Sequence, residues 1–163
     1  MTRPFDTIVV LDHPKHAVNV GGVMRSAVAF GIDAVILVGR RYDREPSDVF
    51  DSLKHLDVLP VRSWDRALEL LCGIPLVTVE RIAGTPPLNT FRHPRRAAYI
   101  FGPEDDSVHR QVIDVSTHRV HIPHATSGNP HWGCLNLATS VAVVLYDRLC
   151  RLESRADRRY ARL

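Results

Sequence analysis

Short apolar runs rich in β-branched residues alternate with helix-like segments, and this alternation restricts the fold more than any other feature of the chain. The spacing predicts strands at residues 7–11, 34–38, 58–61, 76–79, 97–101 and 119–122. It predicts helices at residues 18–30, 46–54, 63–72, 106–115 and 134–155, with Ser63 and Asp106 as N-caps of two of them. Strands that alternate with helices form a mostly parallel sheet with helices on both faces, so we expect an α/β fold.

The length and composition indicate one soluble domain. The chain has 163 residues, of which 45% are hydrophobic, enough for one core and too many for a disordered chain. We expect this domain to cover residues 1–155, followed by a basic tail at 156–163. Without a signal-peptide pattern or a membrane-length apolar run, a cytoplasmic protein with no membrane partner is expected. The last helix is apolar on more than one face, which predicts burial in the core or against a second subunit.

The charged residues leave two explanations open. The net charge is +3, and lysine occurs only at Lys15 and Lys54, so almost all the positive charge is guanidinium. Arginine suits phosphate binding and base stacking, but a GC-rich genome gives the same bias without any function. The three cysteines have no CxxC spacing, so neither a disulfide framework nor a zinc site is expected.

Three loops with small or polar residues follow predicted strands, at residues 19–25, 101–106 and 122–136. Because parallel strands end at a common carboxyl edge, these loops are expected to form one ligand crevice there. The first loop begins at Asn19 with the run NVGG, which has neither the GxGxxG spacing of dinucleotide sites nor the GK[ST] of a P-loop. The third contains Asn136 in the first turn of an apolar segment, which favours a capping or polar-contact role.

Several side chains in these loops have two interpretations. Arg25 lies one or two turns inside a predicted helix, where it either holds a phosphate or is an exposed residue of an amphipathic helix. Asp105 and Asp106 suit a helix N-terminus, whereas Glu104, directly after Gly-Pro, is less well explained in that way. Cys134 is either a nucleophile or, as free cysteines usually are, a small buried hydrophobe.

Histidines cluster near the end of the last predicted strand, at His118, His121, His124 and His131. The first three are spaced i, i+3 and i+6 across a predicted strand and loop, which does not place them on one face. The pattern therefore favours contact with a phosphate at least as much as a metal site, and no metal is expected.

Taken together, the three segments resemble the TrmH/SpoU family of RNA 2′-O-methyltransferases, within the knotted SPOUT class. The resemblance runs in order from residue 7 to about residue 150. The residues that match its three motifs are Asn19, Gly21, Arg25 and Phe30-Gly31, then Gly102 and Glu104, then Ile122-Pro123, Leu135-Asn136 and Tyr146-Asp147. Two positions depart from the motifs: Ser107 stands where the family has a second glycine, and Cys134 where it has a serine. A serine in a turn that needs a positive φ would be strained.

The resemblance implies a parallel sheet closed by a C-terminal trefoil knot, S-adenosylmethionine as cofactor, and a homodimer. It implies methylation of a ribose 2′-oxygen in RNA, with tRNA favoured over rRNA. The catalytic residues would be Arg25, Asn19, Glu104 and Asn136. The cofactor-binding residues would be Val79, Glu80, Gly102, Ile122, Cys134 and Leu135. Those that meet RNA phosphates would be Arg25, Arg40, Arg41, Arg44, Arg92, Arg95 and Arg96.

Two other functions remain open. A non-catalytic RNA-binding or scaffold protein that keeps the fold is favoured by the departures at Ser107 and Cys134. A small-molecule enzyme of doubly wound type would show a deep closed pocket and no salt-dependent binding of RNA.

Overall fold

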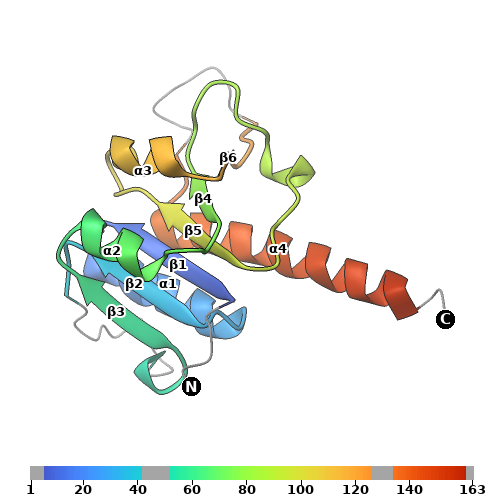
Figure 1. The fold of residues 1–163 in the computed structure, drawn as a ribbon, viewed down its shortest axis with the longest axis horizontal. Helices are drawn as coiled ribbons and strands as arrows, with labels where there is room; N and C mark the ends of the chain where they lie inside the picture. The colour runs from blue at the N-terminus through green and yellow to red at the C-terminus, as the bar shows by residue number, and fades with distance from the viewer. Residues whose placement is uncertain (1–5, 42–51, 126–133, 161–163) are drawn as a thin grey trace.

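The computed structural model describes residues 6–41, 52–125 and 134–160, with side chains described up to residue 152. It contains a six-stranded sheet with the order β3-β2-β1-β5-β4-β6 (Figure 1). Every neighbouring pair of strands is parallel, so the predicted mostly parallel sheet is confirmed. The strands are β1 (Thr7–Asp12), β2 (Ala34–Val38), β3 (Asp57–Val61), β4 (Leu76–Val79), β5 (Ala97–Phe101) and β6 (His118–Val120).

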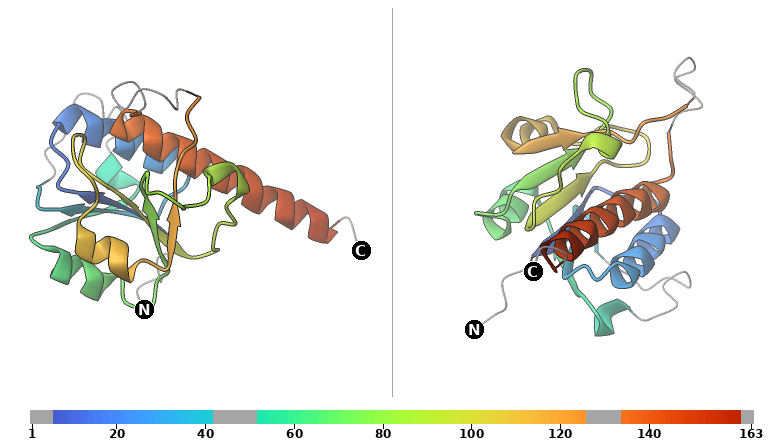
Figure 2. Two further views of the ribbon diagram at one scale, coloured as in Figure 1. Left: turned by 90° about the horizontal axis from the view of Figure 1, so that it is seen from above. Right: turned by 90° about the vertical axis from the view of Figure 1, so that its right-hand side faces the viewer.

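Helices cover both faces of the sheet, as the alternating pattern predicts (Figure 2). On one face lie α1 (Ala17–Ala29) and α4 (Leu137–Tyr160), and on the other lie α2 (Trp64–Leu70) and α3 (Arg110–Val115). Two short 3₁₀ helices, η1 (Ser52–Lys54) and η2 (Leu88–Thr90), complete the described elements. Successive residues of a strand point to opposite faces, so β1 sends Val9 and Leu11 toward α1 and α4, and Ile8 and Val10 toward α2 and α3.

The central strands could be predicted from the sequence because both of their faces are buried. Every residue of β1, β2 and β5 is buried, which requires a nearly continuous apolar run. At the edge of the sheet, β3 is largely exposed, and its bounds begin one residue earlier than predicted. The other edge strand, β6, ends at Val120 and not at residue 122, although His121 makes an isolated bridge to Pro87.

Helix ends differ from the predictions in several places. The N-cap of α3 is His109, so the prediction of Asp106 was wrong: the Asp106 carboxylate accepts the adjacent Ser107 N–H instead. Ser63 does hold the N-cap position of α2, although its side chain makes no capping hydrogen bond within the described chain. The final helix begins at residue 137, after the predicted start, and continues to residue 160, because the residues beyond 155 include no proline or glycine. Most of the helix predicted at 46–54 lies outside the described residues.

No helix in the described part of the chain is long and apolar enough to cross a membrane.

The connector from β4 to β5 is bound to α4 by a buried polar cluster. His93 is buried, and its two ring nitrogens lie 2.7 Å from the Tyr99 hydroxyl and 2.9 Å from the Asp147 carboxylate. Arg151 donates to the same carboxylate at 2.6 Å. Burial lowers the pKa of His93 despite the opposing effect of Asp147, and burial raises the pKa of Tyr99. The connector and the last helix are therefore joined by specific bonds as well as by apolar contact.

The helices α1 and α4 approach each other closely at Gly22. A Cβ added there would lie 2.9 Å from the Ala138 Cβ, which real side chains do not allow. We expect Gly22→Val to lower the free energy of unfolding by about 2 kcal/mol, because overpacking forces the two helices apart. Urea denaturation checks this value.

Ala29→Val is the matched control, because residue 29 is exposed on the same helix. It introduces the same β-branched side chain and should cost only a few tenths of a kcal/mol through helix propensity, roughly the difference between the intrinsic scales. Equal losses in the two variants would show that Gly22 is not a close-contact position.

Candidate functional site

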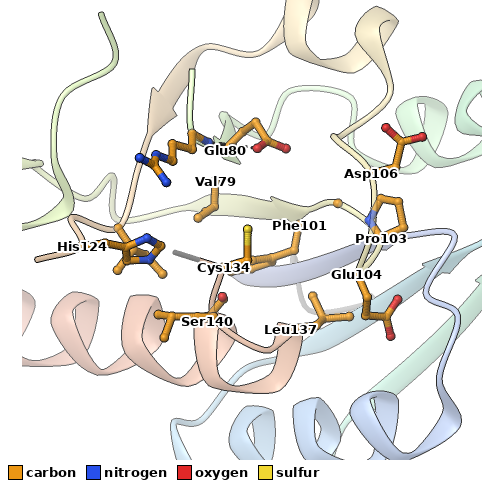
Figure 3. A pocket seen from close by; sticks show the side chains of 14 residues that line it. Val79, Glu80, Phe101, Pro103, Glu104, Asp106, His124, Cys134, Leu137 and Ser140 are labelled. Carbon is orange, nitrogen blue, oxygen red and sulfur yellow. Dashed lines mark hydrogen bonds between the residues drawn. The ribbon is translucent and has the colours of Figure 1, made fainter. Parts of the chain in front are cut away.

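A hollow of about 160 Å³ lies at the carboxyl ends of β4 and β5 (Figure 3). Two of the three predicted loops and the residues that follow β4 form its wall. Its lining residues are Val79, Glu80, Arg81, Phe101, Gly102, Pro103, Glu104, Asp106, Ile122, His124, Cys134, Leu135, Leu137 and Ser140. His124 and Glu104 lie toward opposite ends of the view, with Cys134 between them. The expected crevice at the carboxyl edge of the sheet is therefore present.

Three polar side chains from the three loops meet beside this hollow. The Asn19 amide donates to the Glu104 carboxylate at 2.8 Å, and the Asn136 amide donates to the Asn19 side-chain oxygen at 2.8 Å. These residues are separated in sequence by 85 and 117 positions, so the contacts are made by the fold and not by local structure. Because Asn19 is buried, its amide needs both partners.

Glu104 receives two more hydrogen bonds from the start of α1. The Lys15 N–H donates to one carboxylate oxygen at 2.9 Å, and the His16 N–H donates to the other at 3.1 Å. Partial burial acts to raise the pKa of Glu104, but the bonds from Lys15, Asn19 and His16 outweigh it, and the pKa lies below its ordinary value. Glu104 is thus held as a carboxylate that binds the N-terminal end of α1, which does not suit a general base.

Asn136 has a second task at the start of α4. Its side-chain oxygen accepts the Ala138 N–H at 2.8 Å, which is the capping bond that asparagine makes well. Its amide nitrogen is then turned toward Asn19. Asn136 therefore both caps α4 and connects it to α1. These two roles account for an asparagine there, although asparagine has a low helix propensity.

The turn after β5 is fixed from β4 by Glu80. One carboxylate oxygen of Glu80 accepts the Val108 N–H at 3.1 Å, and the other accepts the Arg81 N–H. The turn passes very close to Gly102: a Cβ there would lie 2.9 Å from the Val108 nitrogen and 3.1 Å from the Ser107 carbonyl carbon. Both of those atoms are backbone, so they cannot move aside as a flexible side chain would.

Ser107, which departs from the family motif, is not strained. His13 is the one non-glycine residue with a positive φ among the residues that the structure describes. The turn at Ser107 therefore adopts a conformation open to any residue, and the expected strain is absent.

All six residues that the resemblance assigns to the cofactor line the hollow. Of the four assigned to catalysis, Glu104 lines it, and Asn19 and Asn136 lie just behind it through the hydrogen bonds above. Arg25 is exposed on α1 and is not among the described residues that line the hollow. The individual roles of these residues stay predictions.

The arginines assigned to RNA are spread over several surfaces. Arg40 and Arg41 line a separate hollow at the ends of β2 and β3. Arg96 forms a 3.7 Å ion pair with Asp6, and the Arg95 carbonyl accepts a bond from Arg148. Arg92 is exposed. Arg44 lies outside the described residues.

Seven of the fourteen lining residues were not assigned to this site from the sequence, and Arg81 and His124 are the two basic ones among them. Arg81 directly follows Glu80 at the end of β4, and its place after a strand that ends at the crevice was an available signal. His124 was grouped with the other histidines; it lines the hollow, and within the described chain its Nδ1 atom is buried and has no hydrogen-bond partner. His121 is hydrogen-bonded to Thr85. No group of three or more His, Cys, Asp or Glu side chains in the described residues is arranged to hold a metal ion.

The chemistry of the lining is mixed. Val79, Ile122 and Leu135 present apolar surface, and the carboxylates of Glu80 and Asp106 stand on the opposite wall in Figure 3 from Leu137. Such a lining suits a ligand that has both an apolar part and a positive charge. The buried nitrogen of His124 also calls for a partner that the described residues do not supply.

The model of the SpoU rRNA Methylase family matches residues 6–146. The chain is 26% identical over 151 residues to an uncharacterised tRNA/rRNA methyltransferase of Synechocystis sp., a match that covers 85% of this chain and 51% of the relative. The chain thus spans about half the length of the curated relative that it matches.

Two solved structures share the fold over nearly the whole chain. The SpoU methyltransferase AviRb from Streptomyces viridochromogenes, in complex with AdoMet, has a TM-score of 0.79 and 24% identity, over 93% of this chain and 60% of its own. A structure described as giving insights into the 2-OH methylation of C/U34 on tRNA has a TM-score of 0.77 and 25% identity, over 93% of this chain and 99% of its own.

Proposed function

Because this chain belongs to the SpoU rRNA methylase family, we propose that it transfers a methyl group from S-adenosylmethionine to a ribose 2′-oxygen of RNA, with a tRNA as substrate. The observation that carries the proposal is the meeting of Asn19, Glu104 and Asn136 beside one hollow. We assign the activity to the single domain of residues 1–155.

The residues of the hollow fit S-adenosylmethionine. Val79, Ile122 and Leu135 offer an apolar surface to the adenine ring, and Glu80 and Asp106 offer negative charge to the cationic end. Gly102 lets the turn at residues 106–108 pass close to the end of β5, in space that a side chain at residue 102 would occupy. When bound, the cofactor supplies an electrophilic methyl group on a positively charged sulfur.

The chain's own residues must position and activate the attacking hydroxyl. An alcohol is barely acidic near neutral pH, so most of the catalysis comes from its orientation and the removal of its proton. The low pKa of Glu104 and its full set of donors leave it as a structural carboxylate that orients Asn19. Arg25 cannot readily give up its proton, so its role would be to hold the adjacent phosphate or to stabilise negative charge on the 2′-oxygen.

We propose a homodimer that uses the α1 and α4 face. Val18 on α1 and Tyr146 on α4 are each 61% exposed, and Leu135 before α4 is 41% exposed. Exposed large apolar side chains on two packed helices favour burial against a second copy. Arg25 lies on α1 but outside the hollow of its own chain, so a dimer would allow it to serve the partner's hollow.

We further propose the trefoil knot of the SPOUT class, with the chain after β6 threaded through the connector between β4 and β5. Backbone bonds join His121 to Pro86 and Leu88 in this connector. Later in the chain, Arg151 donates to the Asn89 carbonyl at 2.6 Å. The connector is therefore bound both to the end of β6 and to α4, as threading requires.

Calorimetry with S-adenosylmethionine and mapping of 2′-O-methyl groups test the proposal. The wild-type protein should bind the cofactor, and RNA from a deletion strain should lack one 2′-O-methyl group that the purified protein restores. A protein that binds RNA but not the cofactor would instead be the scaffold.

We expect Gly102→Ala to weaken S-adenosylmethionine binding at least tenfold, because the new methyl group must displace the backbone of residues 106–108. Isothermal titration calorimetry measures the effect. Ser107→Ala is the matched control: it adds no atom to the same turn, and residue 107 is exposed. Unchanged affinity in Gly102→Ala would show that this turn does not shape the cofactor site.

A further inference from the structure

A second hollow, of about 300 Å³, lies at the carboxyl ends of β2 and β3 and takes no part in the cofactor site. Three of its lining residues are arginines: Arg40 and Arg41 follow β2, and Arg62 follows β3. Gly39, Pro60 and Val61 complete the lining, so no carboxylate stands among the described residues around it. Arginines that line one hollow with no carboxylate in its described lining favour the binding of an anion there.

Gly39, in the wall of this hollow, packs against His13, whose backbone is strained. His13 has a φ of 44°, in the left-handed region that a non-glycine residue rarely adopts. Its ring packs directly against Gly39, where a Cβ would lie 2.2 Å from the ring. Gly39 itself has a φ of 72°, so it provides both the room and the conformation that the ring requires.

Asp12 holds His13 in this position. The Asp12 side chain is buried, and one of its oxygens accepts bonds from the His13 Nδ1 at 2.6 Å and from the Trp64 indole at 2.8 Å. The other oxygen accepts the His109 N–H at 2.8 Å. Because all of these donors use the Asp12 carboxylate, it contributes no exposed negative charge to the hollow.

Arg40 connects the two loops that meet here. Its guanidinium donates to the Pro14 carbonyl at 3.0 Å and also to the Lys15 carbonyl. The Lys15 N–H in turn binds Glu104 at the cofactor hollow. These bonds connect the two hollows along the carboxyl edge of the sheet. Arg41 and Arg62 are the exposed cations of the second hollow.

We propose that this hollow binds a backbone phosphate of the substrate RNA, within a few nucleotides of the ribose that is methylated, with Arg41 and Arg62 as its donors. The proposal rests on the proposed function and names how that function engages its substrate. Neighbouring strands lie about 4.8 Å apart, so the hollow at β2 and β3 is three strand spacings, on the order of 14 Å, from the cofactor hollow at β4 and β5. An RNA strand laid along the carboxyl edge of the sheet reaches both.

The salt dependence of RNA binding tests the proposal. A fluorescently end-labelled, unfractionated tRNA pool serves as the probe, titrated at several salt concentrations. Arg62→Gln should weaken binding several-fold and reduce the slope of log K against log salt by about 0.7–0.9, the loss of one phosphate contact. Arg41→Gln should do the same, and the double variant should lose about twice as much slope.

Arg110→Gln is the matched control. It removes the same charge from an exposed residue that is paired with Asp114 on α3 and that does not line the hollow within the described residues. Its slope should equal that of the wild type. If Arg110→Gln loses as much slope as Arg62→Gln, the effect comes from net charge alone and the proposal is overturned. An unchanged slope in Arg62→Gln would also overturn it. So would a wild-type protein that binds no RNA.

Measuring cofactor binding distinguishes a failure of the phosphate site from a failure of the proposed function. Arg62→Gln should bind S-adenosylmethionine with wild-type affinity, because Arg62 does not line the cofactor hollow within the described residues. A wild-type protein that binds the cofactor and methylates RNA, together with an Arg62→Gln variant of unchanged slope, refutes the phosphate site alone. A wild-type protein that binds no cofactor refutes the proposed function.

Discussion

Arg25→Ala should reduce methyl transfer roughly 10²–10³-fold, the effect of removing one donor that stabilises charge in a transition state. Binding of S-adenosylmethionine should not change, because Arg25 is exposed on α1 and is not among the described residues that line the cofactor hollow. Single-turnover transfer from radiolabelled cofactor measures the first quantity, and calorimetry measures the second. A fully active Arg25→Ala protein would refute any role for this side chain in the reaction.

Arg66→Ala is the control for loss of an exposed arginine from a helix. Arg66 lies on α2, where it is paired with Glu69 on the opposite face of the sheet from α1. It should keep wild-type rates of transfer. A comparable loss in Arg66→Ala would mean that the rate responds to net charge and not to the position of residue 25.

A mixture of two defective proteins tests whether Arg25 serves the partner's hollow. Arg25→Ala keeps an intact hollow, and Gly102→Ala keeps Arg25 but has an impaired hollow. If Arg25 acts across the proposed dimer, a heterodimer of the two contains one complete site, and mixing should restore transfer. If Arg25 acts within its own chain, no complete site exists, and the mixture should transfer no more methyl groups than the two proteins do separately.

The orientation of Arg25 shows what helix periodicity can and cannot predict. The spacing of apolar residues predicted α1 almost to its ends, because its buried residues recur at Val20, Val23 and Ala27. That spacing also buries Asn19 and turns Arg25 outward. The sequence showed that both residues lie near a crevice, but it contained no information on a second copy of the chain that would place Arg25 in a site.

The strands were the most predictable part of the fold, and the loop contacts were the least. β2, β4 and β5 begin and end where the apolar runs do, because a parallel strand covered on both faces is nearly all apolar; the buried Thr78 in β4 is the exception among these three strands. The hollow lined by Arg41 and Arg62 was not predicted, because its residues come from two loops and single arginines carry no spacing signal. Glu104 was singled out as poorly explained by the start of the helix that follows it, and its partners at the start of α1 were not identifiable before the chain was folded.

Glu104→Gln should lower the free energy of unfolding by roughly 2–3 kcal/mol at neutral pH, the range for hydrogen bonds to a charged group and for donors left unpaired. Three donors point at the two carboxylate oxygens, from Lys15, Asn19 and His16. A glutamine amide must turn its NH₂ group toward at least one of them, so a donor faces a donor. Methyl transfer should fall as well, roughly 10²-fold, because Asn19 loses the partner that orients it.

The same substitution should remove part of the pH dependence of stability. The folded state lowers the pKa of Glu104, so its ionised form stabilises the fold at pH values above its ordinary pKa of about 4.3. This contribution is lost as the pH falls from there toward the lower pKa of the folded state. The difference in urea midpoint between wild type and Glu104→Gln should therefore be constant near neutral pH and shrink below about pH 4.

Asp105→Asn, at an exposed carboxylate paired with Lys15, should change stability little at any pH. A Glu104→Gln protein as stable as the wild type at pH 7 would show that Glu104 does not hold the three motifs together.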